Sequence, residues 1–523
     1  MSHDFDYLIR NATVFDGVSA IPQYLSVGTR GDQIAYVGPP LTAASARRVI
    51  DAVGLYLCPG FIDTHASTGL GYRFPHAGDH KLFQGVTTEI VGNCGTSTGP
   101  ISDRLVPTMR SLAHDIGFTF DWRTLDEWFR RVTTHGLPFN VGTFAGHSTL
   151  RGGVCGDQEN ITESEIERMQ ALLDQAMTDG AFGLSTGLVY SPGSFAETPE
   201  LIALADVAAR HGGLYVSHIR DERQALEEAI EEAIEIGRSA GLAVLISHLK
   251  AAERPNWGKV PAAIRRIEEA RESGLEVTFE VYPYTATSTK LRTFIPKAMM
   301  AGGVDGMVEE LSSEASREQA VAWLHERGTD FERMVMLTGG SLGEAGESVE
   351  QIARSTDRDP AETAVDLLLD DPDAWIIYDC IDPDDMDAAI LWPQSIICSD
   401  SWSHPVNVPN QIGDPHPRTF GAFTRFLERY ALSEPRIPFG NAVRKITSYP
   451  AEALGLESRG RIAEGGFADL VLLDPTRVRE RATYTDPRQL SDGTDFVWVN
   501  GTLMLEKGQL MPKLPGQVLR SSQ

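Results

Sequence analysis

Residues 214–250 decide the fold; they read L-Y-V-S-H-I-R-D-E-R-Q-A-L-E-E-A-I-E-E-A-I-E-I-G-R-S-A-G-L-A-V-L-I-S-H-L-K. Two short apolar runs, 214–217 and 244–247, are typical of buried strands, and a histidine follows each of them. Between them, residues 226–234 have the apolar spacing of a helix with an acidic, solvated face. This order predicts two parallel strands joined by a crossover helix.

The same alternation of strands and helices extends in both directions along the chain. Further strands are predicted at 60–64, 88–92, 139–143, 181–185, 276–281 and 395–399. Eight such strands with intervening helices predict an α/β fold, a (β/α)8 TIM-like barrel over residues 59–454. The gap between the last two strands exceeds a normal crossover, so we expect an inserted subdomain at residues 290–340.

The two chain ends have a different pattern, with short strands and tight turns. Residues 6–17 alternate apolar and polar side chains and end on Asp-Gly, a hairpin signal. Residues 468–474 and 496–501 also read as strands. We expect one small composite β domain, a sandwich or barrel, from residues 1–58 and 455–523; two separate β appendages are the alternative.

Composition excludes several classes of function. The 523 residues carry 46 basic and 73 acidic side chains, a net charge of -27 that opposes binding to nucleic acid or anionic membranes. No run of apolar residues is long enough to span a bilayer, and no signal peptide begins the chain. Five widely spaced cysteines suit a reducing compartment, so we expect a cytoplasmic protein whose notable cysteine is a ligand or a nucleophile.

Five predicted strands end at residues that can bind metal or move protons: His65, Cys94, His218, His248 and Asp400. A lone histidine after an apolar run is usually structural, but a barrel would bring all five ends around one axis. One thiolate and two imidazoles, from Cys94, His218 and His248, are the donor set of a catalytic zinc site with an open position. Asp400 could then hold a water molecule and transfer its proton.

Four motifs carry a resemblance to a known family. They are P-G-F-I-D-T-H (59–65), G-V-T-T-E-I-V-G-N-C-G (85–95), S-H-I-R-D-E (217–222) and S-H-L-K (247–250). With them the chain resembles the amidohydrolase superfamily and, within it, the N-acyl-D-amino-acid deacylases, or D-aminoacylases. The resemblance implies zinc-dependent hydrolysis of the amide bond of an N-acylated D-amino acid, a small anionic substrate.

The resemblance also implies roles for individual residues. Cys94, His218 and His248 would hold one tightly bound zinc ion, with His65 as a weaker ligand, and Asp400 would be the catalytic acid and base. The expected substrate-binding residues are Lys250, Tyr282, Ser288, Tyr190, His65 and Arg151. Arg151 and Arg220 could equally form ion pairs within the scaffold.

One departure from the family pattern affects the number of metal ions. The family strand ends His-x-His, whereas this chain reads His65-Ala66-Ser67, and the acidic residues expected next are Thr68 and Gly69. A second metal site should therefore be weak or absent. His76 or His80 is the alternative source of the missing ligand.

Three other functions remain open at this point. The chain could catalyse another amidohydrolase reaction, such as cleavage of a cyclic amide or imide, of an N-carbamoyl group, or deamination. It could be a ligand-binding relative with impaired catalysis, or an enzyme with Cys94 as nucleophile. The oligomeric state is also open.

Overall fold

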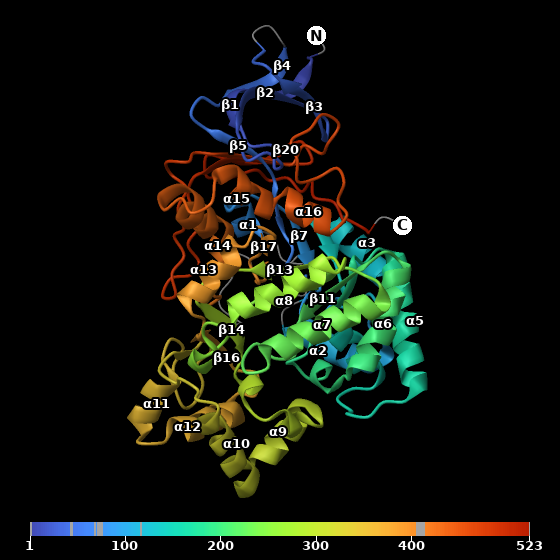
Figure 1. Ribbon diagram of the computed structural model, residues 1–523, viewed down its shortest axis with the longest axis vertical. Coiled ribbons are helices and arrows are strands. Elements are labelled where there is room, and N and C mark those ends of the chain that lie inside the picture. The colour runs from blue at the N-terminus through green and yellow to red at the C-terminus, as the bar shows by residue number, and fades with distance from the viewer. Residues whose placement is uncertain are drawn as a thin grey trace.

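Strands and helices alternate along most of the chain in a mixed α/β fold (Figure 1). The structure is a computed structural model that describes residues 3–41, 45–66, 69–70, 77–115, 118–403 and 414–521. Among these residues, no helix is long and apolar enough to cross a membrane.

Parallel strands form the centre of the molecule in two sheets. One has the order β6-β7-β8 and the other β17-β13-β12-β11-β10-β9, with every neighbouring pair parallel. Their bounds overlap all eight predicted strands, which confirms that part of the prediction. The strands are β6 (Phe61–Asp63), β7 (Val86–Val91), β8 (Asn140–Thr143), β9 (Ala145–Gly146), β10 (Gly183–Gly187), β11 (Leu214–His218), β12 (Val244–Ile246), β13 (Val277–Val281) and β17 (Ser395–Ile397).

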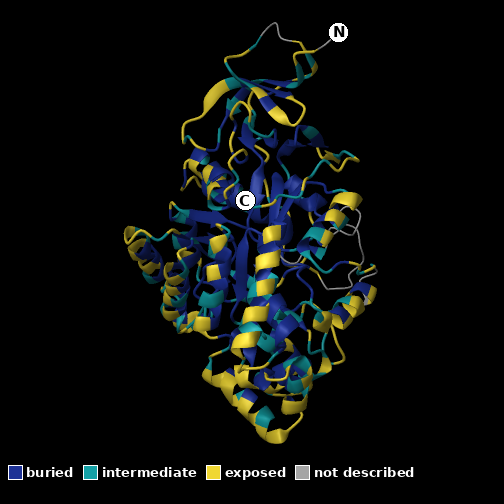
Figure 2. Ribbon diagram, turned by 90° about the vertical axis from the view of Figure 1, so that its right-hand side faces the viewer, coloured by how far each residue is buried: buried dark blue, intermediate teal, exposed yellow. Residues whose placement is uncertain are grey.

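Helices cover the outside of these strands, which are buried along their length (Figure 2). In α7 (Leu226–Ala240) the apolar side faces the strands, whereas Glu228, Glu231 and Glu235 face solvent, as the sequence predicts. Gly241 ends this helix in the left-handed region. The other helices around the strands are α1 (Asp79–Phe83), α2 (Val106–Asp115), α3 (Leu125–His135), α4 (His147–Val154), α5 (Glu163–Asp179), α6 (Thr198–Arg210), α8 (Val260–Glu272), α13 (Pro383–Leu391), α14 (Arg418–Phe426), α15 (Phe439–Ile446) and α16 (Ser448–Ala453).

The two chain ends pair in one nine-stranded sheet. β18 runs antiparallel to β5, and β5 leads directly into β6 of the parallel part. Ile9, Leu57, Leu472 and Trp498 share its buried core, so apolar residues from both ends contribute. The strands are β1 (Phe5–Val14), β2 (Gln23–Arg30), β3 (Gln33–Gly38), β4 (Ala46–Asp51), β5 (Tyr56–Pro59), β18 (Leu470–Leu473), β19 (Thr494–Val499), β20 (Thr502–Glu506) and β21 (Gln509–Leu510).

A third, antiparallel sheet interrupts the chain between β13 and β17. Its order is β14-β16-β15, and four helices lie beside it at the lower end of Figure 1. The predicted insertion, 290–340, lies inside this longer run, because the central strand β16 comes back from much further along the chain. The elements are β14 (Ala286–Lys290), α9 (Gly303–Leu311), α10 (Glu314–Glu326), β15 (Met334–Met336), α11 (Val349–Thr356), α12 (Pro360–Asp370) and β16 (Trp375–Asp379).

A buried lysine joins α15 to β17 and makes stability depend on pH. Lys445 donates hydrogen bonds to the Trp392 carbonyl oxygen and to Ser395 Oγ (2.8 Å). Burial, helped by Arg444, lowers the pKa of Lys445 to about 7. In the unfolded chain a lysine keeps its proton to about pH 10.4, so the unfolded state binds more protons between these values.

We predict that Lys445 makes the free energy of unfolding rise as pH increases above 7, by at most about 1.4 kcal/mol per pH unit. Below pH 7 both states carry the charge, and this contribution stays at its lowest value. Urea unfolding from pH 6 to pH 9 should show a steeper rise for wild type than for Lys445→Met. Equal slopes in the two proteins would contradict the prediction.

Candidate active site

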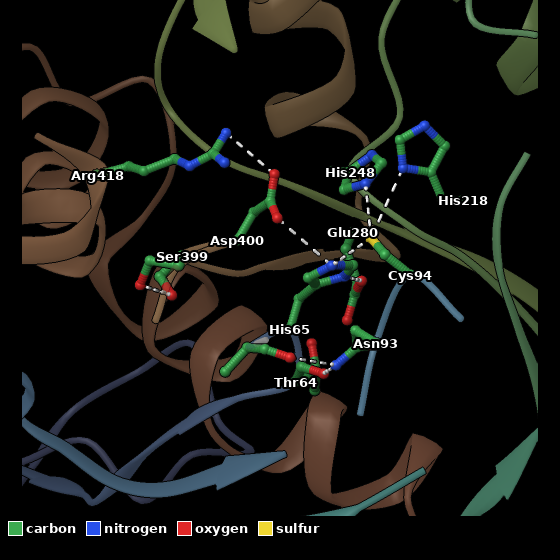
Figure 3. A network of polar contacts seen from close by, with 12 residues as sticks. Thr64, His65, Asn93, Cys94, His218, His248, Glu280, Ser399, Asp400 and Arg418 are labelled. Carbon is green, nitrogen blue, oxygen red and sulfur yellow. Dashed lines mark hydrogen bonds and ion pairs between the residues drawn. The ribbon is translucent and has the colours of Figure 1, made fainter. Parts of the chain in front are cut away.

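The five predicted strand-end residues meet at the carboxyl ends of the parallel strands (Figure 3). Cys94 Sγ lies 3.3 Å from His65 Nε2, 3.6 Å from His218 Nδ1 and 3.5 Å from His248 Nε2. Asp400 Oδ1 lies 3.5 Å from His65 Nε2. Residues from five different strand ends therefore form one cluster, because parallel strands expose the same ends at one edge.

The backbone at this cluster adopts a left-handed conformation that residues other than glycine rarely take. Cys94, His248 and Asp400 have φ values of 51°, 35° and 46°. Left-handed residues of this kind are costly and gather at functional sites, where the surrounding structure holds them. Each of the three lies two or three residues after a strand of the parallel sheets, so the turns at these strand ends present the side chains to the cluster.

The spacing of the donor atoms fits a tetrahedral zinc ion. Typical bond lengths of about 2.3 Å to sulfur and 2.0–2.1 Å to nitrogen put sulfur and nitrogen about 3.5–3.6 Å apart on such an ion. Cys94 Sγ has this separation from both His218 Nδ1 and His248 Nε2. Cys94 thus has, from each of the two histidines that the sequence predicts as ligands, the separation that a shared zinc ion requires. The groups of possible metal ligands in the described part of the chain are His65, Cys94, His248 and Asp400, and His218, Glu222 and His248.

His65 Nε2 faces both Asp400 and Cys94, whereas His65 Nδ1 contacts a carboxylate on the opposite side of the ring. His65 Nδ1 lies 2.6 Å from Glu280 Oε2, and both side chains are buried. This contact favours a proton on Nδ1 and leaves Nε2 directed at the site. His65, Cys94, His248 and Asp400 also form a group of possible metal ligands within the described part of the chain.

Electrostatics favours the metal-binding forms of Cys94, His218 and Asp400, whereas the burial of His65 is outweighed by Glu280 and Cys94, which raise its pKa and favour its cationic form. Burial raises the pKa of the Cys94 thiol, but His65 and its neighbours outweigh burial and lower it. Burial lowers the pKa of His218 to about 4, so its imidazole is neutral. Burial likewise raises the pKa of Asp400, yet Arg418 and the nearby imidazoles bring it well below its ordinary value. The cluster therefore offers a thiolate, a neutral imidazole and a carboxylate.

Glu222 lies on the far side of the two histidines that are predicted to bind metal. Its Oε1 lies 3.1 Å from His248 Nδ1, and its Oε2 lies 3.7 Å from His218 Nε2. Lys250 Nζ donates to the same carboxylate (2.5 Å) and lies 2.8 Å from His248 Nδ1. A carboxylate behind a ligand histidine fixes its tautomer and ring orientation. Sequence reasoning missed Glu222, although an acidic residue four positions after His218 was a visible signal.

Arg418 is a second residue that sequence reasoning did not assign to the site. Its Nη1 lies 3.0 Å from Asp400 Oδ2, and its guanidinium stacks 4.6 Å from the centre of the Tyr282 ring. Lys250 Nζ lies 5.8 Å from the same ring. Tyr282 thus contacts two buried cations, and burial raises the pKa of its hydroxyl to about 12. The H-P-R motif contains Arg418, but only the fold shows that it reaches Asp400.

The insertion contributes to the site through β14. The edge of the Tyr190 ring packs on His218, with centroids 5.0 Å apart, and Thr289 hydrogen bonds with Tyr190. Side chains alternate along a strand, so Ser288 points to the face of β14 opposite Thr289. The structure therefore brings Tyr190 to the cluster, whereas the role of Ser288 in substrate binding stays a prediction.

Arg151 does not join this group of residues. It is fully buried in α4, where its Nε lies 3.1 Å from Glu200 Oε1. Arg220 pairs in the same way with Glu232 at 2.8 Å. The structure shows both arginines in ion pairs of the scaffold, and the contact of Arg151 with substrate stays a prediction. Sequence alone could not decide, because the acidic partners lie on other helices or turns of the fold.

The alternative ligands for a second metal ion receive no support among the described residues. His80 is buried in α1, and its ring packs on Phe420 with centroids 4.6 Å apart. The groups of possible metal ligands found in the described part of the chain do not include it. Ser67, Thr68 and His76 lie outside the described residues.

Comparison with known proteins places this cluster in a family. Residues 48–365 and 391–504 match the model of the amidohydrolase family. The chain is 33% identical to an N-acyl-D-glutamate deacylase of Alcaligenes xylosoxydans xylosoxydans, over 99% of this chain and 97% of the relative.

Two solved structures share the fold over nearly the whole chain. One is the N-acyl-D-glutamate deacylase of Bordetella bronchiseptica, in complex with zinc and a phosphonate mimic of the tetrahedral intermediate. It superposes with a TM-score of 0.83 and 32% sequence identity over 99% of both chains. The other is a D-aminoacylase described as having a binuclear metal centre, with one-metal activation and second-metal attenuation. It superposes with a TM-score of 0.83 and 32% sequence identity over 99% of this chain and 100% of that one. The chain therefore belongs to the amidohydrolase family and resembles its N-acyl-D-amino-acid deacylases from end to end.

Proposed function

We propose that this protein hydrolyses the amide bond of N-acyl-D-amino acids with a zinc ion held by Cys94, His218 and His248. The observation that carries the proposal is the distance of Cys94 Sγ from one nitrogen of each of the two histidines, with the Asp400 carboxylate in the same cluster. The deacylases to which the chain is similar support the substrate class.

One tightly bound ion is the expected content of the site. When bound, zinc polarises the scissile carbonyl group and lowers the pKa of a water molecule. A second ion would have His65, Cys94 and Asp400 as its described ligands besides His248, which belongs to the first site. Two of those three side chains would also have to serve the first site or the proton transfer, which disfavours a second ion.

Asp400 is the acid and base of the proposed reaction. Its Oδ2 is held by Arg418, which leaves Oδ1 directed toward the cluster of ligands. Oδ1 takes up the proton of the attacking water and returns it to the leaving nitrogen. The low pKa of Asp400 keeps the carboxylate deprotonated before the reaction, as a general base requires.

Lys250 and Tyr282 bind the α-carboxylate of the substrate. Both are buried next to His248 and Asp400, where a carboxylate would meet a cation and a hydroxyl group. Without substrate, Glu222 neutralises Lys250. The substrate carboxylate therefore competes with Glu222 for the Lys250 ammonium group.

The two parallel sheets are taken as one (β/α)8 barrel, flanked by the composite β domain of residues 1–58 and 455–523. A parallel bridge between Ala66 and Ser401 supports closure, because it joins the end of β6 to the segment after β17. The short step from β8 to β9 supports it on the other side. Closure explains how strand ends from the whole chain reach one axis.

Removing the thiol should remove both the metal and the activity. We predict about one zinc per chain in wild type and D-selective release of acetate from N-acetyl-amino acids. Cys94→Ala should lose both, since only two ligands remain. Cys155→Ala, the matched control, removes a buried thiol outside the cluster and should keep both. Elemental analysis with a D and L substrate panel checks this; a Cys94→Ala enzyme that still hydrolyses at the wild-type rate would refute the metal site.

Asp400→Asn should separate metal binding from proton transfer. The amide keeps the size of the side chain but cannot take up a proton, so kcat should fall by about 10²- to 10⁴-fold while zinc content stays at the wild-type level. Initial rates on N-acetyl-D-amino acids give kcat, and elemental analysis gives the zinc content. A kcat within a factor of three of wild type would rule out Asp400 as the base.

Lys250→Met should selectively lower kcat/KM for substrates that carry a carboxylate. A lost charge-assisted hydrogen bond should lower kcat/KM for the N-acetyl-D-amino acid about 10- to 100-fold more than for the matching α-carboxamide. The carboxamide controls for any shared effect through Glu222 and His248. Equal decreases in kcat/KM for the two substrates would show that Lys250 does not bind the carboxylate.

A further inference from the structure

A completely buried lysine lies below the cluster of ligands, outside the residues used so far. Lys81 extends from α1, and its Nζ lies 2.5 Å from Asp63 Oδ2 and 3.5 Å from Glu89 Oε1. It also donates to Ser399 Oγ (2.7 Å) and Ser401 Oγ (3.1 Å). The side chains of Lys81, Asp63 and Glu89 have no exposed surface. A buried ammonium group with four polar neighbours is fixed in position.

The partners of Lys81 lie directly beside reactive residues in the chain. Ser399 and Ser401 flank Asp400, and Asp63 comes two residues before His65. Asp63 in turn accepts hydrogen bonds from the Ser399 hydroxyl (2.5 Å) and the Ser399 backbone N–H (3.0 Å). The network therefore joins the end of β6 to the end of β17 immediately below the site.

Asp400 needs such support because of its backbone. Its φ of 46° lies in the left-handed region, which an aspartate occupies at a cost. The hydroxyl groups on either side of it bond to the same ammonium group and to each other (2.8 Å). These contacts fix the residues on both sides of Asp400 and so stabilise the strained turn.

The charges of the network also require Lys81. Asp63 and Glu89 are two buried carboxylates, and Lys81 is the cation that contacts both. Burial lowers the pKa of Lys81, but the two carboxylates outweigh burial and raise it above its ordinary value. Lys81 is therefore charged, and its removal would take a buried cation away from both carboxylates.

We infer that Lys81 is a positioning residue for Asp400, acting through Ser399, Ser401 and Asp63 to hold the carboxylate in its catalytic place. The ion pairs and hydrogen bonds of the Lys81 ammonium group described above all go to this network. The inference rests on the proposed function, because it assumes that Asp400 is the acid and base.

The test uses a variant in which charge is balanced. Lys81→Met alone could unfold the protein, so the variant is Asp63→Asn/Lys81→Met, which removes one charge of each sign. Asp469→Asn/Arg459→Met is the matched control, since it removes a buried pair below 5% side-chain exposure in the segment that precedes β18. Zinc content, kcat, KM and a crystal structure are measured for both variants and for wild type.

We expect kcat of Asp63→Asn/Lys81→Met to fall roughly 10- to 100-fold, with KM and zinc content unchanged. In its crystal structure the separation of Asp400 Oδ1 and His65 Nε2 should increase from 3.5 Å. The control variant should lose stability but keep kcat. Unchanged kcat and an unmoved Asp400 would overturn the inference. If wild type hydrolyses no N-acyl-amino acid, the proposed function fails, and the crystal structure alone then decides whether Lys81 positions Asp400.

Discussion

The structure depends on the convergence of three imidazole rings on one sulfur atom. Cys94 Sγ contacts histidines that are 29, 124 and 154 residues away in the chain. Such contacts require that the parallel strands keep their register, because a shift by one residue turns each side chain to the other face of its strand. They also require left-handed turns at Cys94 and His248. The buried core and the covering helices serve this arrangement by fixing where each strand ends.

The second constraint is the burial of charge around the cluster. Each ionic group that was placed at the site has an opposite partner: Asp400 has Arg418, Lys250 has Glu222, and His65 has Glu280. Buried ion pairs add little net stability, since desolvation of both partners offsets their attraction. What they provide is a preorganised field, in which a developing charge meets fixed dipoles and ions instead of mobile water. The site therefore has a cost in stability that the large apolar core must offset.

Sequence reasoning was accurate wherever the signal was local. Apolar runs of strand length followed by His218 and His248 located both strands and brought both histidines to the cluster, because a strand and the residue after it are adjacent in the chain. The residues it missed, Glu222 and Arg418, act through partners that only the tertiary structure supplies. Arg151 could not be resolved for the same reason, as Glu200 lies on another helix. The antiparallel sheet at the insertion extends beyond residues 290–340, because β14 pairs with a strand some 90 residues later in the chain.

The central claim is that one zinc ion is bound by one sulfur and two imidazole nitrogens. Zinc K-edge X-ray absorption on the zinc-loaded protein tests it most directly. The account predicts one sulfur at about 2.3 Å, with nitrogen and oxygen neighbours at about 2.0–2.1 Å. It also predicts no neighbouring metal at the separation of about 3.5–4 Å that is typical of two-metal sites. A first shell without sulfur, or a metal neighbour at that distance, would contradict the account.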